Sequence, residues 1–185
     1  MKTNKSIIFT GKSKRGTDIV IRYPKMSDLS EILKYVNKLS KEKTYVAFQG
    51  ERISRKEEKD WLEKSLTRMK KKQEVGLSIF VGKQVIGICG VRLGRSVKKH
   101  IGSLGLSIDV DYRGEGLGKI LTTEVLKEAK KKLAGLKVVT LEVFEKNKIA
   151  QNLYWKLGFK EYGRLPKGLE HRGKYTDEIF MDKEI

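Results

Sequence analysis

The sequence predicts a single α/β domain built on a mixed β-sheet. Its 185 residues suit one domain, and no internal repeat, low-complexity tract or linker divides them. Apolar segments of strand length are joined in some places by short turns and in others by amphipathic helices. A short turn joins antiparallel strands, whereas a strand–helix–strand crossover joins parallel strands, so both kinds of pairing are expected in one sheet.

The chain is expected to begin with a β-hairpin. Residues 7–9 and 19–23 are rich in β-branched and aromatic side chains and flank the turn-like stretch TGKSKRGTD. Pro24 would end the second strand, because proline has no backbone N–H to donate to a neighbouring strand. Ser27 and Asp28 then offer an N-cap for a helix. The apolar face of that helix comprises Leu29, Ile32, Leu33, Val36 and Leu39.

A second helix and two strands follow residues 41–53, which have no clear period and are interpreted as a loop. Ser54 is placed to cap the helix, whose acidic residues lie early and whose lysines lie late, as the helix dipole favours. The predicted strands are residues 75–81 and 84–93, with a turn between them. The apolar face of the helix comprises Trp61, Leu62, Leu66 and Met69.

A strand at residues 101–110 leads into a glycine-rich stretch and a third helix. Apolar residues on this helix recur every four positions, and Gly135 suits its C-terminal end. These apolar residues are Leu117, Leu121, Val125, Ala129 and Leu133. The remaining predicted elements are a strand at residues 137–144, a helix at 147–157 that ends at Gly158, and two strands near 159–164 and 176–183.

The net charge of the chain is +18, from 41 Lys and Arg against 23 Asp and Glu. A surface of this charge attracts polyanions such as nucleic acid, the ribosome, acidic lipid or a phosphorylated cofactor. The alternative is a lysine-rich surface that serves only solubility, because short lysine clusters end predicted helices, where the helix dipole favours cations. Both interpretations stay open, and the sequence is compatible with weak ribosome association and with a homodimer.

Cys89 is the only cysteine, so no intramolecular disulfide can form, which fits a reducing compartment. Its apolar surroundings, VIGICGV, favour a buried thiol that packs as a small hydrophobe. With two histidines and one cysteine, no metal site is expected from the usual ligand spacings. The apolar runs are too short to span a bilayer or to form the core of a signal peptide, so we expect a cytoplasmic protein without a membrane partner.

The stretch DYRGEGLGK, residues 111–119, places three glycines at alternate positions just before the third helix. A strand that turns through glycines into a helix exposes backbone N–H groups at the positive end of the helix dipole, which is an anion site. Arg113 and Lys119 add positive charge, so the stretch could hold a pyrophosphate. A Walker A loop and a dinucleotide-binding fingerprint are excluded by the spacing, since Ile120 follows the lysine and Lys119 stands where the fingerprint needs glycine.

Residues 113–118 fit the pattern (Q/R)-x-x-G-x-(G/A), which resembles the acyl-CoA loop of the GNAT superfamily of N-acetyltransferases. The stretch LEVFEKNKIAQNLYWKLGFKEYG, residues 141–163, resembles the next strand and helix of that family. The order of elements also agrees from about residue 18 to residue 185, with residues 1–17 as an extra N-terminal strand and turn. Val110 departs from the proline that many members have before the loop. The matching positions of the second stretch are Asn147, Ala150, Leu153, Tyr154, Gly158 and Phe159.

The resemblance, which extends to ribosomal-protein and amine N-acetyltransferases, implies two central parallel strands that splay apart around acetyl-CoA, with no metal. Carried over, these strands are residues 104–110 and 138–144. Backbone groups of β-strand residues would pair with the pantetheine arm, and one N–H would polarise the thioester carbonyl. The implied cofactor-binding residues are Leu106, Ser107, Ile108, Arg113, Gly114, Glu115, Gly116, Leu117, Gly118, Lys119 and Asn147.

The implied reaction is direct attack of a primary amine on the thioester. Glu142 matches a family position that acts as the base in some members, and the alternative is a salt bridge to a lysine. Tyr154 matches the tyrosine that protonates the departing thiolate, and the alternative is a core tyrosine. Asn147 matches a residue that hydrogen-bonds the cofactor, and it would serve equally as a helix N-cap.

The resemblance leaves the acceptor open among a protein N-terminus, a lysine and a small amine. Residues 41–53 and 166–178 would frame the acceptor mouth. The cationic side chains there, Lys167, Arg172 and Lys174, would suit an acceptor with acidic groups. The glutamates there, Glu51 and Glu170, could instead bind a cation. A second hypothesis is a basic module that binds nucleic acid or the ribosome on a GNAT scaffold without turnover.

Overall fold

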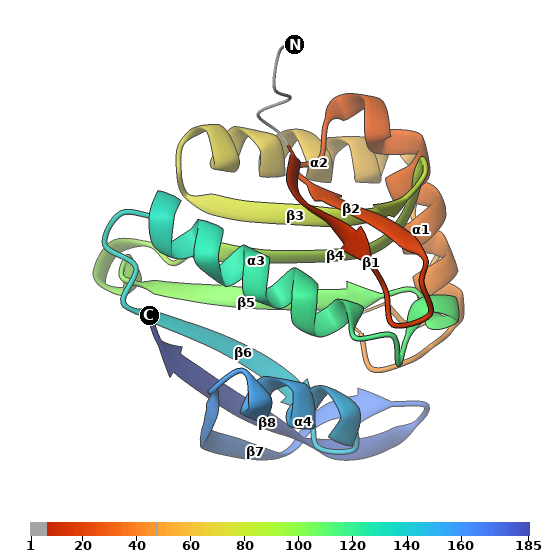
Figure 1. Ribbon diagram of the computed structural model, residues 1–185. Helices are drawn as coiled ribbons and strands as arrows, with labels where there is room; N and C mark the ends of the chain where they lie inside the picture. The colour runs from red at the N-terminus through yellow and green to blue at the C-terminus, as the bar shows by residue number, and fades with distance from the viewer. Residues whose placement is uncertain (1–6, 47) are drawn as a thin grey trace.

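A mixed β-sheet of eight strands runs through the molecule in the order β1-β2-β3-β4-β5-β6-β8-β7 (Figure 1). The computed structural model describes residues 7–46 and 48–185. The pair β5–β6 is parallel, and the other neighbouring pairs are antiparallel. The predicted α/β domain with a mixed sheet is therefore confirmed.

The helices and strands lie close to their predicted positions. The strands are β1 (Ile7–Lys12), β2 (Asp18–Arg22), β3 (Glu74–Val81), β4 (Gln84–Leu93), β5 (Ile101–Ile108), β6 (Val138–Phe144), β7 (Lys160–His171) and β8 (Lys174–Glu184). The helices are α1 (Leu29–Lys41), α2 (Arg55–Lys70), α3 (Leu117–Lys132) and α4 (Lys148–Lys156), with short 3₁₀ turns η1 (Met26–Asp28), η2 (Ser96–Lys98) and η3 (Val110–Tyr112).

The last two strands, β7 and β8, are longer than predicted. They continue to a tight turn at Arg172 and Gly173, so the segment expected to connect two short strands is itself a hairpin. The pairing of β7 with β8 is irregular between Leu165 and Leu169, which breaks the alternation that identifies a strand. Pro166 is tolerated because β7 is an edge strand, where a missing N–H disrupts no ladder on the open side.

One predicted strand end and one predicted side-chain cap differ because an aspartate is engaged elsewhere. The strand predicted to reach residue 110 ends at Ile108, since the Asp109 carboxylate accepts a hydrogen bond from the Asp111 N–H and turns the chain into η3. Asp28 lies at the N-cap of α1, but its side chain does not cap that helix. It accepts hydrogen bonds of 2.7 and 2.8 Å from the Arg22 guanidinium instead.

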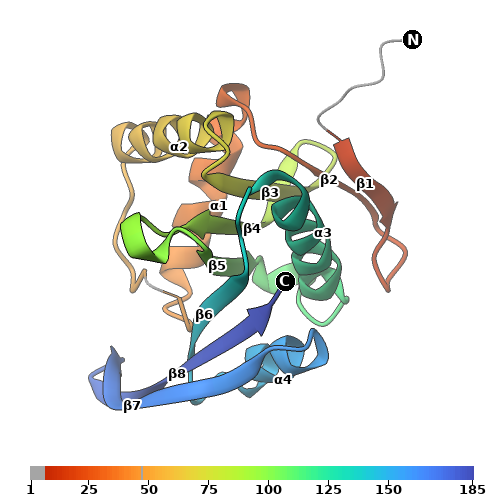
Figure 2. The same ribbon diagram turned by 90° about the vertical axis from the view of Figure 1, so that its left-hand side faces the viewer.

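Helices α1 and α2 cover one face of the sheet, and α3 and α4 cover the other (Figures 1 and 2). The apolar residues predicted at four-residue spacing on α3 are all buried, which confirms that periodicity. On α2, Ser54 forms the predicted cap and Leu62 is buried against the sheet. The prediction that Trp61 belongs to the apolar core face of α2 is wrong. Its side chain is 45% exposed, because it faces the cavity described below rather than the core.

The parallel strands β5 and β6 separate after three residue pairs. They pair at Ile101–Val138, Gly102–Val139 and Ser103–Thr140, and beyond these pairs each strand continues without the other. The ribbons of β5 and β6 diverge accordingly in Figure 1. The edge of β5 that faces β6 therefore has backbone groups without a strand partner, as the predicted splay requires.

Candidate active site

A cavity of about 1210 Å³ opens where β5 and β6 diverge. Residues from both helical layers line it, so it extends to both faces of the sheet. The lining includes Leu106, Ser107 and Ile108 of β5, Glu142 of β6, Tyr154 of α4, and Trp61 of α2. The glycine loop, residues 113–119, forms one wall, to which every residue contributes except Glu115. The structure thus brings nearly all the predicted site residues to one cavity.

The glycines of this loop have two different structural roles. Gly114 and Gly116 have φ angles of 78° and 81°, in the left-handed region that favours glycine. Gly116 is the N-cap of α3 and offers no side chain to cap it, so the first N–H groups of that helix are available to an anion. Gly118 supplies space instead, since a Cβ there would lie 3.2 Å from the Leu153 Cδ2 atom.

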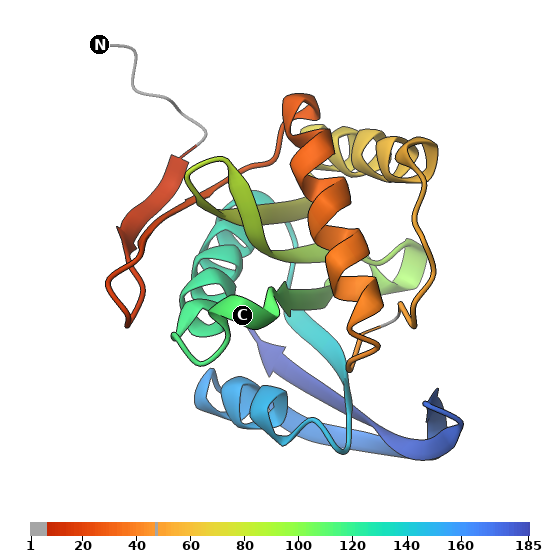
Figure 3. The ribbon, with the colours of Figure 1, turned by 90° about the vertical axis from the view of Figure 1, so that its right-hand side faces the viewer.

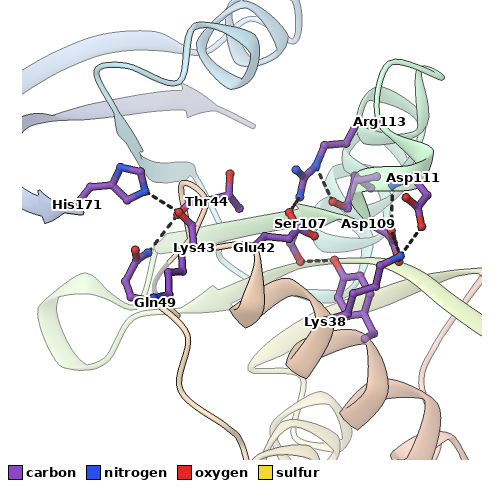
Figure 4. A network of polar contacts seen from close by, with 12 residues as sticks. Lys38, Glu42, Lys43, Thr44, Gln49, Ser107, Asp109, Asp111, Arg113 and His171 are labelled. Atoms are coloured by element: carbon purple, nitrogen blue, oxygen red, sulfur yellow. Dashed lines mark hydrogen bonds and ion pairs between the residues drawn. The ribbon is translucent and has the colours of Figure 1, made fainter.

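Helix α1 holds the β5–α3 loop by ion pairs (Figure 4). Figure 3 shows α1 lying across β4 near the end of β5. The Lys38 ammonium lies 2.6 Å from the Asp109 Oδ1 atom and 2.6 Å from the Asp111 Oδ2 atom. Hydrogen bonds to Asp109, and then to Asp111, raise the pKa of Lys38 above its ordinary value. Because Asp109 is almost fully buried, Lys38 is the main compensation for its charge.

Two further contacts extend this network. The Arg113 guanidinium donates to the Glu42 carboxylate over 2.6 Å and to the Ile108 carbonyl over 2.9 Å. The Tyr35 hydroxyl, on the buried face of α1, donates to the Ser107 Oγ atom over 2.7 Å. Arg113 lies at the cavity as predicted, but its charge is paired with Glu42, so its side chain fixes the loop as well as facing the site.

Tyr154 is buried on α4, with its ring edge-on to Phe159 at a centroid distance of 5.8 Å. Burial, and then the neighbouring Cys89 thiol, raise the pKa of the Tyr154 hydroxyl, so it stays protonated near neutral pH. Cys89 is itself fully buried, as predicted, and burial raises the pKa of its thiol to about 12. Tyr154 thus combines core packing, the alternative weighed for it, with a place on the cavity wall.

Glu142 lies on the α1–α2 face of β6, with an exposed side chain at the cavity. Glu142 pairs in register with Phe180, and Phe144 pairs with Glu178, so the two glutamates are diagonal neighbours on one face. Burial, and then the charge of Glu142, raise the pKa of Glu178. Within residues 7–46 and 48–185 no ion pair involves Glu142, which favours the base over the salt-bridge alternative.

Asn147 caps α4, because its Oδ1 atom accepts the Ala150 N–H over 3.2 Å. It also lines the cavity, so the two roles weighed for it are compatible. Glu115 differs from the other predicted loop residues. Its side chain is buried away from the cavity, where its Oε1 atom lies 3.4 Å from the Arg15 guanidinium and its Oε2 atom has no partner among the described residues.

The two segments expected to frame the acceptor mouth touch one another (Figure 4). The Lys43 carbonyl lies 2.8 Å from the His171 Nε2 atom and accepts a hydrogen bond from Arg172. The rings of Tyr45 and His171 are also in contact, at a centroid distance of 5.1 Å and an interplanar angle of 40°. The cavity lining includes none of Lys167, Arg172, Lys174, Glu51 and Glu170. On this side its carboxylates are those of Glu142 and of Glu178, the last residue of the second segment.

Sequence reasoning missed Tyr35 and Lys38 on α1, Glu42 at the C-cap of α1, and Glu178 on β8. The first three recur at helical spacing along the edge of the apolar face of α1, and this polar stripe was the only local signal for them. Their partners lie about seventy residues away, so the pairing itself left no trace in local sequence.

Comparison with known proteins identifies the class. The sequence model of the Acetyltransferase (GNAT) family matches residues 35–159, and the chain therefore belongs to this family and is an acyltransferase. No curated protein gives a significant sequence match. The helices of the described residues include none long and apolar enough to cross a membrane. The same residues bring together no group of three or more His, Cys, Asp or Glu side chains suited to a metal ion.

Solved structures of the family share the fold. A GNAT-family acetyltransferase from Streptococcus pneumoniae has 27% identity and a TM-score of 0.81, over 90% of this chain and 99% of that one. Ribosomal-protein-alanine N-acetyltransferase from Brucella melitensis has 23% identity and a TM-score of 0.78, over 89% and 99%. A ribosomal L7/L12 alpha-N-protein acetyltransferase in complex with coenzyme A has 12% identity and a TM-score of 0.80, over 97% and 98%.

Proposed function

We propose that this enzyme transfers the acetyl group of acetyl-CoA to a primary amine by direct attack. One observation carries the proposal: a single cavity at the β5–β6 splay is lined by the glycine loop, by Tyr154 and by Glu142. These are an anion site, a protonated hydroxyl and a carboxylate, the groups that this transfer needs. The acceptor is a protein N-terminus, a lysine side chain or a small amine.

The residues present fit coenzyme A. The N-terminus of α3, with its left-handed glycines, suits the pyrophosphate, and the unpaired edge of β5 suits an arm that carries amide groups. Bound acetyl-CoA would supply an activated acyl group as a thioester. Leu106, Ser107 and Ile108 would hold the arm by their backbone groups. An N–H among them would stabilise negative charge that develops on the carbonyl oxygen.

Glu142 would accept the proton of the attacking amine, directly or through water. The need for a base depends on the acceptor, since a lysine-type amine with a pKa near 10.4 is neutral about one part in a thousand near pH 7. An α-amine, with a pKa near 7.8, is neutral at about a tenth or more under the same conditions. Glu142 therefore matters most if the acceptor is a strongly basic amine.

Tyr154 would donate to the departing sulfur. Its raised pKa keeps the hydroxyl protonated, so a donor is always present at neutral pH. The same raised pKa makes full proton transfer to a thiolate, whose pKa is near 8.5, unfavourable. Tyr154 then acts chiefly by a hydrogen bond that stabilises the thiolate, and solvent supplies the final proton.

The test is acetyl-CoA turnover against a panel of α-amine peptides, lysine peptides, polyamines and amino acids, followed by release of free thiol. Isothermal titration calorimetry measures CoA binding in parallel. The proposal predicts CoA binding and at least one amine that accelerates thiol release. A folded protein that neither binds CoA nor releases thiol with any amine would contradict it.

Besides the fold, the net charge of the chain favours a protein acceptor on the ribosome. This charge, +18, attracts polyanions such as the ribosome. Two of the structural neighbours are named as acetyltransferases of ribosomal proteins. Association with ribosomes should weaken steeply as salt is raised. RNA binding of this kind without CoA binding would instead favour the non-catalytic basic module.

A further inference from the structure

The turn between β1 and β2 reaches the glycine loop. The Lys14 N–H donates to the Glu115 carbonyl over 3.3 Å, and the Arg15 guanidinium lies 3.4 Å from the Glu115 carboxylate. Figures 1 and 3 both place the tip of this hairpin beside the start of α3. The extra N-terminal strand, to which the sequence assigned no function, therefore contacts the proposed cofactor site.

Hydrogen bonds within the turn fix its shape. The Ser13 N–H donates to the Thr17 carbonyl over 2.9 Å, and the Gly16 N–H donates to the Ser13 carbonyl over 3.0 Å. The Ser13 hydroxyl accepts from the N–H groups of Arg15 and Thr17, and the left-handed φ of 83° at Gly16 closes the turn. Lys14 therefore projects from a built turn with a defined position.

The Lys14 side chain lies over Gly116, at the N-terminus of α3. Its Cε, Cγ and Cδ atoms are 3.4, 3.7 and 3.8 Å from the point that a Cβ on Gly116 would occupy. Lys14 lines the same cavity as Gly114 and Gly118. In the part of the chain that the structure describes, its ammonium has neither a hydrogen-bond acceptor nor an ion-pair partner.

A cation placed at the positive end of a helix dipole is unfavourable unless an anion joins it. The first turn of α3 has no acidic residue, and the nearby Glu115 carboxylate contacts Arg15 rather than Lys14. We propose that Lys14 binds the pyrophosphate of coenzyme A together with the glycine loop. This inference rests on the proposed function. Arg15 and Glu115 act as positioning residues that hold the turn against the loop.

The experiment measures CoA affinity by isothermal titration for the full chain and two variants. Lys14→Met keeps an aliphatic stem over Gly116 and removes the charge. Lys12→Met is the matched control, because Lys12 lies in the same hairpin but its ammonium is 2.7 Å from the Asp18 carboxylate. We expect Lys14→Met to raise the Kd for CoA about tenfold, as for a hydrogen bond to a charged group, and Lys12→Met to leave it unchanged.

Four outcomes separate the possibilities. The same loss with dephospho-CoA, which lacks the 3′-phosphate, and a weaker salt dependence of CoA binding in Lys14→Met support the pyrophosphate contact. A loss that disappears with dephospho-CoA overturns it, and so does unchanged CoA affinity in a Lys14→Met variant with the parent melting temperature. If the parent itself does not bind CoA, the proposed function fails first, and this result is distinct from the other three.

Discussion

The Lys38 ammonium lies 2.6 Å from the Asp109 carboxylate and ties α1 to the loop that enters α3. Asp109 is buried, so Lys38→Met leaves its charge without its main partner. We expect a loss of about 1–3 kcal/mol in the free energy of unfolding, as for a buried acceptor left unsatisfied. Urea denaturation measures it. Lys34→Met, which breaks only an exposed pair with Glu31, is the control, and an equal loss there would contradict the assignment.

The left-handed glycine at the start of α3 should be needed for binding beyond its effect on folding. Gly116 and Gly135 both have a φ of 81°, and only Gly116 lies at the cavity. Alanine at either position should cost about 1–2 kcal/mol of stability through backbone strain. Only Gly116→Ala should also weaken CoA binding, by roughly tenfold or more. Similar CoA affinities in the two variants would indicate that the loop glycine serves the fold alone.

The raised pKa of Glu178 predicts a pH-dependent stability. Burial and the charge of Glu142 make its ionised form unfavourable in the folded protein. The folded state thus holds the proton to a higher pH than the unfolded state, and stability is lost as pH rises from the ordinary glutamate pKa of about 4.3 through the raised value. Glu178→Gln should therefore melt higher than the parent at pH 8 but not at pH 4. A difference independent of pH would be inconsistent with this origin.

Glu142→Gln should slow acetylation of a strongly basic amine most near neutral pH. The rate should recover in part at high pH, because the amine then loses its proton without help. The measurement is kcat/KM from pH 6 to pH 10, with Glu161→Gln on the exposed edge strand as control. An equal loss at every pH would assign Glu142 a structural role.

Much of this architecture follows from local patterns. The spacing of apolar residues on α3, the Ser54 cap and the glycine loop each depend on residues within a few positions of one another, so sequence reasoning finds them. The divergence of β5 and β6 was predicted from the family resemblance alone, since nothing in the composition of these strands sets where their pairing stops.

The remaining features depend on contacts between distant segments. Lys14 reaches a loop about one hundred residues away, and Lys38 pairs with a residue about seventy positions along the chain. Each is one lysine among many, and its role is decided only by which element the fold places beside it. The full length of β7 and β8 was missed for a local reason, because a bulge and a proline obscure the alternation of the β7–β8 hairpin.

Tyr154 offers the sharpest test that the cavity at the β5–β6 splay performs acetyl transfer. Tyr154→Phe keeps the ring against Phe159 and removes only the hydroxyl. Single-turnover transfer to the best amine of the panel should slow by about 10²–10³-fold, as for the loss of one hydrogen bond to a developing anion, toward the lower end if water substitutes, with CoA affinity unchanged. Tyr162→Phe, an exposed ring on β7, should have no effect. A Tyr154→Phe rate within about twofold of the parent would mean that Tyr154 serves only packing and would contradict its proposed role in the transfer.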